Sequence, residues 1–176
     1  MKKRRFLGGF LAAFGLLLIV WKALDGARWY TQGLLSCAAV IGPMLHGWVL
    51  ETSASGLAPE WVRGTDRVQA SLQFDALAVG VVPVVALIVA TPGLALRRRV
   101  TLSAVGAGLC FVTDTLIVAA FPLLVFYKNA FTDVLGTFLG LIGFVGAPVI
   151  IWFCLTFHDL QRWLPSLRRD QPPAPR

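Results

Sequence analysis

Long apolar runs are the feature of this sequence that most restricts its fold. About 20 apolar residues span the hydrocarbon core of a bilayer, and four runs reach that length, at residues 6–24, 74–96, 101–126 and 131–157. The composition agrees, because 57% of residues are hydrophobic and only 14% are charged, whereas soluble proteins are about a quarter charged. The sequence therefore predicts an all-α integral membrane protein with four transmembrane helices.

The positions of the basic residues predict how these spans are oriented. Cytoplasmic loops carry an excess of lysine and arginine, and basic clusters occur at Lys2–Arg5, at Arg97–Arg99 and in the carboxy-terminal tail. Four spans place all three clusters on the cytoplasmic side, with both termini inside. The apolar start resembles a signal peptide, but Trp21–Ala27 has no pair of small residues for cleavage. We expect an uncleaved anchor.

The segment between the first two spans, residues 25–73, is expected on the outer side. Gly33–Leu50 would form an interfacial or re-entrant helix there, broken near Gly42–Pro43 because proline lacks a backbone donor. Residues 51–56 have the composition of a loop. Residues 68–74 alternate between apolar and polar side chains, which indicates a strand. That strand could form a small hairpin with residues 58–62, or the segment could be an extended linker.

Together these features predict one helical membrane domain over residues 1–170. Residues 171–176 are rich in proline and are expected to be disordered. The net charge of +7 does not indicate nucleic acid, because the basic residues lie beside the apolar runs. The expected partner is the bilayer, together with other membrane proteins. The three cysteines Cys37, Cys110 and Cys154 show no metal-ligand spacing, and no metal or cofactor is predicted.

The fourth span carries the clearest stripe of small residues. Helices associate in lipid through small residues that allow close approach. The stripe has spacings of four, three and four residues, which keeps its members on one helical face: Gly136, Gly140, Gly143 and Ala147. The sequence predicts that another helix packs there. Pro83 and Pro148 are expected to bend their spans.

The third span contains one charged residue, Asp114, on the same face as Ser103 and Cys110. An ionised aspartate at mid-bilayer costs about 2.5–3.5 kcal/mol on insertion scales, so we expect it to face the interior of the bundle. Two interpretations remain open, a structural polar contact and a site of relay, ligand binding or transport. Its candidate partners are Arg28, Arg63, Arg67, Lys128 and Thr137.

Cys37 and His46 offer the residue types of a thiol site on the outer side. A cysteine nucleophile needs an adjacent base, but residues nine positions apart lie on opposite sides of a helix. They would meet only if the chain refolds at Gly42–Pro43. Motifs of metalloproteases, P-loop proteins and serine hydrolases do not occur in the sequence.

The layout of residues 30 to 125 resembles the exosortase/archaeosortase family of membrane-embedded cysteine transpeptidases. The resemblance lies in the stretch Gly33–Gly42, in residues 77–99 with their terminal Arg triplet, and in the span that begins at Val100. The catalytic residues of that family do not carry over, since Gln73–Leu77 stands at the cysteine motif and Thr113–Ile117 near the arginine motif. The chain is more similar to the small proteins that accompany exosortases, in particular exosortase H-associated membrane proteins.

This resemblance implies an accessory role in a bacterial sorting system of the inner membrane. We expect a non-catalytic scaffold subunit, with no assigned molecular activity. Two alternatives remain: an intramembrane cysteine transpeptidase or protease that uses Cys37, and a small proton-coupled transporter centred on Asp114.

Overall fold

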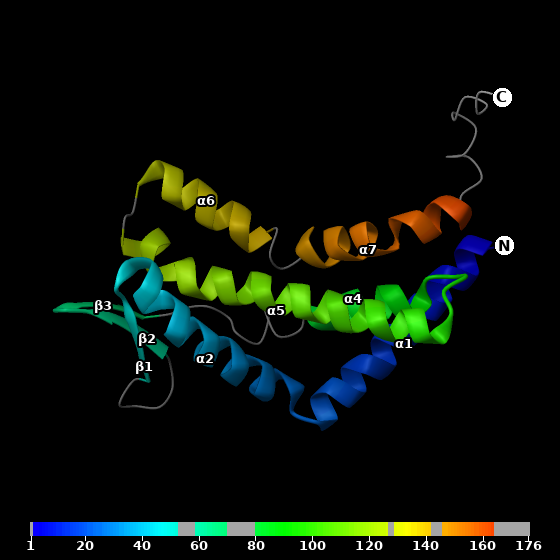
Figure 1. The fold of residues 1–176 in the computed structure, drawn as a ribbon, viewed down its shortest axis with the longest axis horizontal. Coiled ribbons are helices and arrows are strands. Elements are labelled where there is room, and N and C mark those ends of the chain that lie inside the picture. Colours follow the sequence, from blue (N-terminus) through cyan, green and yellow to red (C-terminus); the bar gives the residue numbers. More distant parts are fainter. Residues whose placement is uncertain (1, 53–58, 70–79, 127–128, 142–145, 164–176) are drawn as a thin grey trace.

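The computed structural model describes the chain except for residues 1, 53–58, 70–79, 127–128, 142–145 and 164–176 (Figure 1). Helices predominate, and a small sheet lies at one end of the molecule. The elements in chain order are α1 (Lys2–Ala23), α2 (Gly26–His46), β1 (Val49–Thr52), β2 (Pro59–Arg63), β3 (Asp66–Gln69), α4 (Val81–Ala90), α5 (Leu96–Phe126), α6 (Ala130–Leu141) and α7 (Ala147–Trp163). The predicted tail, residues 171–176, lies outside the described residues.

Among the described residues, two helices are long and apolar enough to cross a membrane. They are α1, over Phe6–Ala23, and α5, over its whole length. The predicted helices at 6–24 and 101–126 are thereby confirmed as helices. α5 has 31 residues and is about 46 Å long at 1.5 Å per residue. It begins at Leu96, so the arginine triplet lies in its first turn.

The other two predicted spans are described differently. α4 has only 10 residues and ends at Ala90, close to Pro92, because a residue before proline disfavours helical geometry. The predicted fourth span, residues 131–157, corresponds to two helices, since α6 ends at Leu141 and α7 begins at Ala147. Pro148 does not bend a helix as expected. It occupies the first turn of α7, where the missing N–H breaks no hydrogen bond.

The expected break near Gly42–Pro43 is wrong. α2 begins at Gly26 and continues through Pro43 to His46. The proline is close to the carboxy-terminal end, where Gly47 adopts φ 73° and its N–H donates to the Pro43 carbonyl at 3.1 Å. Such a left-handed glycine is a common helix end. The helix runs alongside α5 toward the sheet (Figure 1).

A hairpin is present as predicted, with other bounds, and it belongs to a three-stranded antiparallel sheet of order β1-β2-β3. The strand predicted at 68–74 is described as Asp66–Gln69, and residues 70–74 lie outside the described residues. β2 pairs with β3 so that Trp61 lies opposite Val68, and Gly64 in the turn has φ 63°. β1 pairs with β2 and includes Glu51. The expectation of a loop from residue 51 is therefore wrong for Glu51 and Thr52, which belong to this strand.

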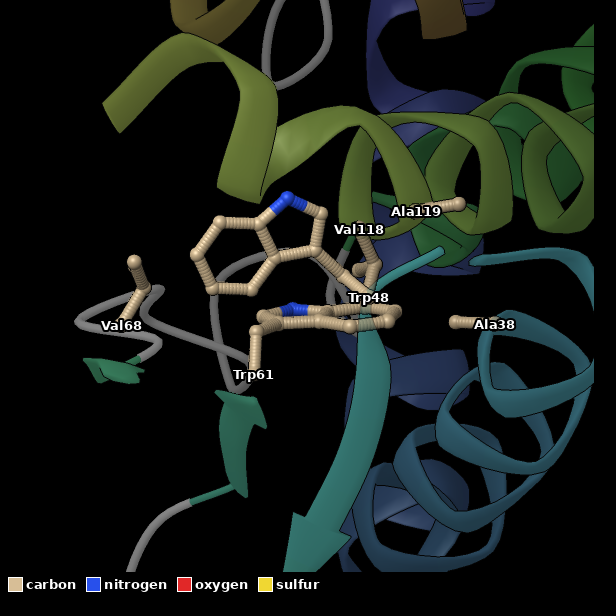
Figure 2. Close-up of a cluster of buried hydrophobic side chains, with 6 residues drawn as sticks. All are labelled: Ala38, Trp48, Trp61, Val68, Val118 and Ala119. Atoms are coloured by element: carbon tan, nitrogen blue, oxygen red, sulfur yellow. The ribbon is translucent and has the colours of Figure 1, made fainter. Parts of the chain in front are cut away.

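Two tryptophans fix the sheet onto the helices. Trp48 and Trp61 are fully buried in a cluster with Ala38, Val118 and Ala119, and Figure 2 shows both indoles between the strands and α5. Gly42 allows this packing, because a Cβ there would lie 2.7 Å from Cη2 of Trp61. The residue expected to interrupt α2 serves instead as the contact surface for an indole ring.

The opposite part of the molecule has its own core, formed by α4, α5 and α7. Val84 and Ile88 are fully buried, and Cys110 packs with them. At Gly106 a Cβ would lie 2.8 Å from Cγ1 of Val84. The close approach of α4 to α5 therefore depends on a glycine at this crossing point.

Candidate functional site: a buried tyrosine–aspartate contact

Asp114 faces the interior of the protein, as its position in the apolar run predicts. Its residue is only 5% exposed. The hydroxyl of Tyr30 donates a hydrogen bond to Oδ2 of Asp114 at 2.7 Å, across 84 residues of sequence. α5 positions the carboxyl group and α2 positions the hydroxyl. The contact joins the first part of the chain to its central helix.

Aromatic rings enclose Tyr30. Its ring meets the edges of Trp21 and Phe111, with centroids 6.1 Å and 5.5 Å away. Burial, followed by the hydrogen bond to Asp114, raises the pKa of the Tyr30 hydroxyl above its ordinary value. The Tyr30 hydroxyl therefore stays protonated, as its role as donor in this contact requires. Gly33 lies one turn further along α2, where a Cβ would come within 3.2 Å of the Phe111 ring.

The turn between α1 and α2 sets the direction from which Tyr30 enters. Asp25 adopts a left-handed conformation with φ 51°, which is uncommon for a residue other than glycine. At Gly26 a Cβ would lie 2.6 Å from the Trp21 ring, so the chain can fold back only with glycine there. The same Trp21 ring touches Tyr30. The turn and the polar contact are thus one packed unit.

The other polar residues of the predicted face contribute differently. Cys110 is buried at 4% exposure in the α4–α5–α7 core. Ser103 has a buried Oγ without a hydrogen-bond partner among the described residues. The threonines beside Asp114 donate to carbonyls of their own helix, Thr113 to Leu109 and Thr115 to Phe111. Of the predicted set, Asp114 makes the polar contact with another helix.

The three arginines predicted as partners of Asp114 make other contacts. Arg28 lies 3.9 Å from Asp25, Arg67 bonds Glu60 at 3.2 Å, and the Arg63 guanidinium stacks over the Trp48 and Phe126 rings. Thr137 on α6 is an exposed residue and Lys128 lies outside the described residues, so these two partners stay predictions. Sequence reasoning missed Tyr30 because it considered charged partners and one hydroxyl, and a tyrosine after the first span was not weighed.

The predicted thiol site is not assembled. Cys37 is exposed, and it shares the continuous helix α2 with His46, whose side chain is not among those described. On one helix, residues nine positions apart face opposite sides. The refolding at Pro43 that could have joined them does not occur. The described residues also contain no group of three or more His, Cys, Asp or Glu side chains that could hold a metal ion.

The predicted glycine stripe is divided between two helices. Gly136 and Gly140 belong to α6, Ala147 begins α7, and Gly143 lies outside the described residues. A Cβ at Gly136 would meet nothing within 4 Å. The predicted stripe therefore extends over two described helices and over residues 142–145, which lie outside the described residues. The surface around Gly136 is open.

A second buried polar contact was not predicted at all. Nε1 of Trp152 on α7 donates to Oγ1 of Thr91 at 3.0 Å. Thr91 is fully buried and follows α4. Its hydroxyl donates to the Leu87 carbonyl at 2.7 Å, and its own carbonyl accepts from Nη2 of Arg99 at 3.3 Å. One residue therefore connects α4, α5 and α7. Its only signal in the sequence is a position just before Pro92.

Comparison with known proteins yields no relative for this arrangement. No protein-family model, curated protein or solved structure matches the chain. The geometry of the Tyr30–Asp114 contact is therefore the structural basis for a functional argument. It consists of one carboxyl group that is buried, held by a single tyrosine, and positioned between two helices.

Proposed function

We propose that this chain is a non-catalytic subunit of a bacterial inner-membrane complex. In this proposal it crosses the bilayer four times with both termini in the cytoplasm, and it presents residues 25–73, with the sheet, on the outer side. The resemblance to exosortase-associated proteins supplies the proposed setting, a protein-sorting system with an exosortase as the partner.

The observation that carries the proposal is the internal use of Asp114. A buried carboxyl group in an apolar helix is by default a candidate for function. Here its Oδ2 accepts from Tyr30 at 2.7 Å within the same chain. A group engaged in this way holds α2 against α5, and this favours a structural role over docking of another protein by Asp114.

The exposed apolar surfaces of α1 and α6 favour the proposal that these helices contact lipid or other membrane proteins. No residue in the apolar window of α1, Phe6–Ala23, is buried in the protein. α6 exposes Phe131 by 73% and Val134 by 69%, and on another side of the same helix a Cβ at Gly136 would meet nothing within 4 Å. Large exposed apolar surfaces of this kind are typical of sites that contact a membrane or another protein. We assign subunit docking to the side of α6 that carries Gly136.

The test compares two glycines that both have open space around them. Gly136→Leu adds a large side chain to the α6 face, whereas Gly108→Leu adds the same group to α5, where a Cβ would also meet nothing within 4 Å. We expect Gly136→Leu to reduce co-purification of neighbouring membrane proteins by about tenfold, the effect of losing roughly 1.4 kcal/mol of binding, and Gly108→Leu to leave it unchanged. Equal recovery with both variants would exclude docking through α6.

One observation favours a second function, a proton-coupled transporter. Tyr30, Cys110 and Asp114 are titratable groups that lie close together in the interior, with Asp114 and Cys110 both buried. Chains of such groups form relays in pumps and transporters. In this case Asp114→Asn would abolish pH-dependent flux in reconstituted vesicles and leave insertion intact. Flux that persists in the variant would remove this alternative.

A further inference from the structure

The fold brings two basic runs, far apart in the sequence, to one end of the molecule. The first turn of α1 contains Lys2–Arg5, and the first turn of α5 contains Arg97–Arg99. A chain of contacts connects them. Phe6 stacks on Trp152 with centroids 6.3 Å apart, Trp152 bonds Thr91, and Thr91 accepts from Arg99. Figure 1 shows the amino terminus, the start of α5 and the end of α7 together.

The positive charge at this end exceeds what the described residues neutralise. The amino-terminal end of a helix carries a partial positive charge that disfavours cations, yet α5 has three arginines there. Arg98 is paired with Asp159 of α7 at 3.0 Å. Arg99 donates to a backbone carbonyl, and its Nε is buried without a hydrogen-bond partner among the described residues. Arg97 is exposed and has no ion pair in the described part of the chain.

The surface beside this charge is strongly apolar. Leu96 is 78% exposed and Val100 is 63% exposed, one on each side of the arginines. A nucleic acid or an acidic soluble protein offers little to cover such side chains. A phospholipid has the matching chemistry, an anionic phosphate beside acyl chains.

We propose that this end of the molecule is a binding site for anionic phospholipids, in which Arg97 contacts the headgroup phosphate. Arg98 and Arg99, held by Asp159 and Thr91, supply fixed positive charge behind it. The neighbouring Leu96 and Val100 face the acyl chains. The basic turn of α1 adds to the same field, because the Phe6–Trp152 contact holds that helix here. This inference stands apart from the docking role of α6 and does not depend on it.

The test counts lipids retained by the full chain. Protein in nanodiscs of equal phosphatidylcholine and phosphatidylglycerol is released in a native mass spectrometer, and the bound lipids are identified. We expect the wild type to retain phosphatidylglycerol preferentially and Arg97→Gln to retain roughly fivefold less, the contribution of one basic residue near an anionic surface. Arg97→Lys should keep most of the retention. Arg28→Gln is the matched control, an exposed arginine beside an acidic partner, and should resemble the wild type.

Each outcome decides the proposal. Equal retention by Arg97→Gln and Arg28→Gln would overturn it, as would equal retention of both lipids by the wild type. If Arg97→Gln fails to insert, the wild type alone gives the answer, because a bound lipid raises the unfolding temperature. An absent rise on replacing neutral lipid with phosphatidylglycerol would overturn the site. The same rise with inorganic phosphate in neutral lipid would assign it to a soluble anion and overturn the lipid assignment.

Discussion

Two buried polar contacts hold this protein together, and they differ in how visible they are in the sequence. In each, an aromatic side chain donates to an acceptor on a distant helix or at its end: Tyr30 to Asp114 at 2.7 Å, and Trp152 to Thr91 at 3.0 Å. The first acceptor is a carboxyl group with one partner from another helix. The second is a hydroxyl that also donates to its own helix, as serine and threonine do in apolar surroundings.

The difference shows which buried polar residues can be predicted from an apolar sequence and which cannot. A carboxylate in lipid costs so much that its position alone predicts an inward orientation. A threonine hydroxyl can donate to a carbonyl one turn earlier in its own helix, so burying it does not carry this cost. Its position in an apolar run therefore predicts no particular orientation. Thr91 nevertheless organises three helices. The charge of Asp114 therefore makes the Tyr30–Asp114 contact visible in the sequence. The contact at Thr91 joins more helices but has no comparable sequence signal.

The largest expected effect on stability is at the Tyr30–Asp114 contact, with Tyr30→Phe. The ring and its contacts remain, but the buried carboxyl group loses its hydroxyl donor. Hydrogen bonds to charged groups are worth about 1.5–3 kcal/mol, and we expect a loss of that size in the free energy of unfolding. Equilibrium unfolding in detergent measures it.

Its control is a double-mutant cycle with Asp114→Asn. If Tyr30 donates to the carboxylate as described, Tyr30→Phe should cost less in the Asn background, since a hydrogen bond to the neutral amide is worth about 1 kcal/mol and one to a charged group about 1.5–3 kcal/mol. Additive effects would show that the Tyr30 hydroxyl does not interact with the charge of Asp114.

A smaller effect on stability is expected at the Trp152–Thr91 contact, with Thr91→Val. Valine preserves the shape but removes the acceptor for Trp152 Nε1, and a neutral hydrogen bond contributes about 1 kcal/mol. The Leu87 carbonyl also loses its additional donor, but it retains its place in α4. Thermal unfolding of Thr91→Val beside Thr91→Ser, which keeps the hydroxyl, isolates this contribution. A loss as large as that of Tyr30→Phe would mean that the two junctions are energetically alike.

The smallest change is expected from Asp114→Asn alone. The amide oxygen can still accept from Tyr30, and the neutral group has a lower desolvation cost in an apolar interior. Stability should therefore change by less than about 1 kcal/mol, measured by the same unfolding experiment. A large loss would show that the negative charge itself is required, and it would strengthen the transporter alternative.

The same distinction explains how much of the fold could be predicted. Hydropathy identified α1 and α5, because their apolar runs are long and uninterrupted. Alternation over residues 68–74 predicted a strand that overlaps β3 at Val68 and Gln69, and its pairing with β2 was one of two alternatives. The extent of α2 was missed, since Pro43 and Gly42 predict a break when considered alone. The structure shows why they do not, because Gly42 receives the Trp61 ring and Pro43 lies near the helix end.

The sequence by itself determined that α1 and α5 are long apolar helices and that Asp114 faces inward, because both follow from the local cost of placing polar groups in an apolar environment. Only the tertiary structure decided that Tyr30 is its partner, that Thr91 joins three helices, and that contacts through Trp152 and Thr91 connect the two basic runs. These contacts depend on how the chain turns at Gly26 and how α4 and α5 cross at Gly106. At such points the close approach depends on the shapes of both segments that meet. A hydropathy pattern describes one surface at a time, and so it cannot specify a partner.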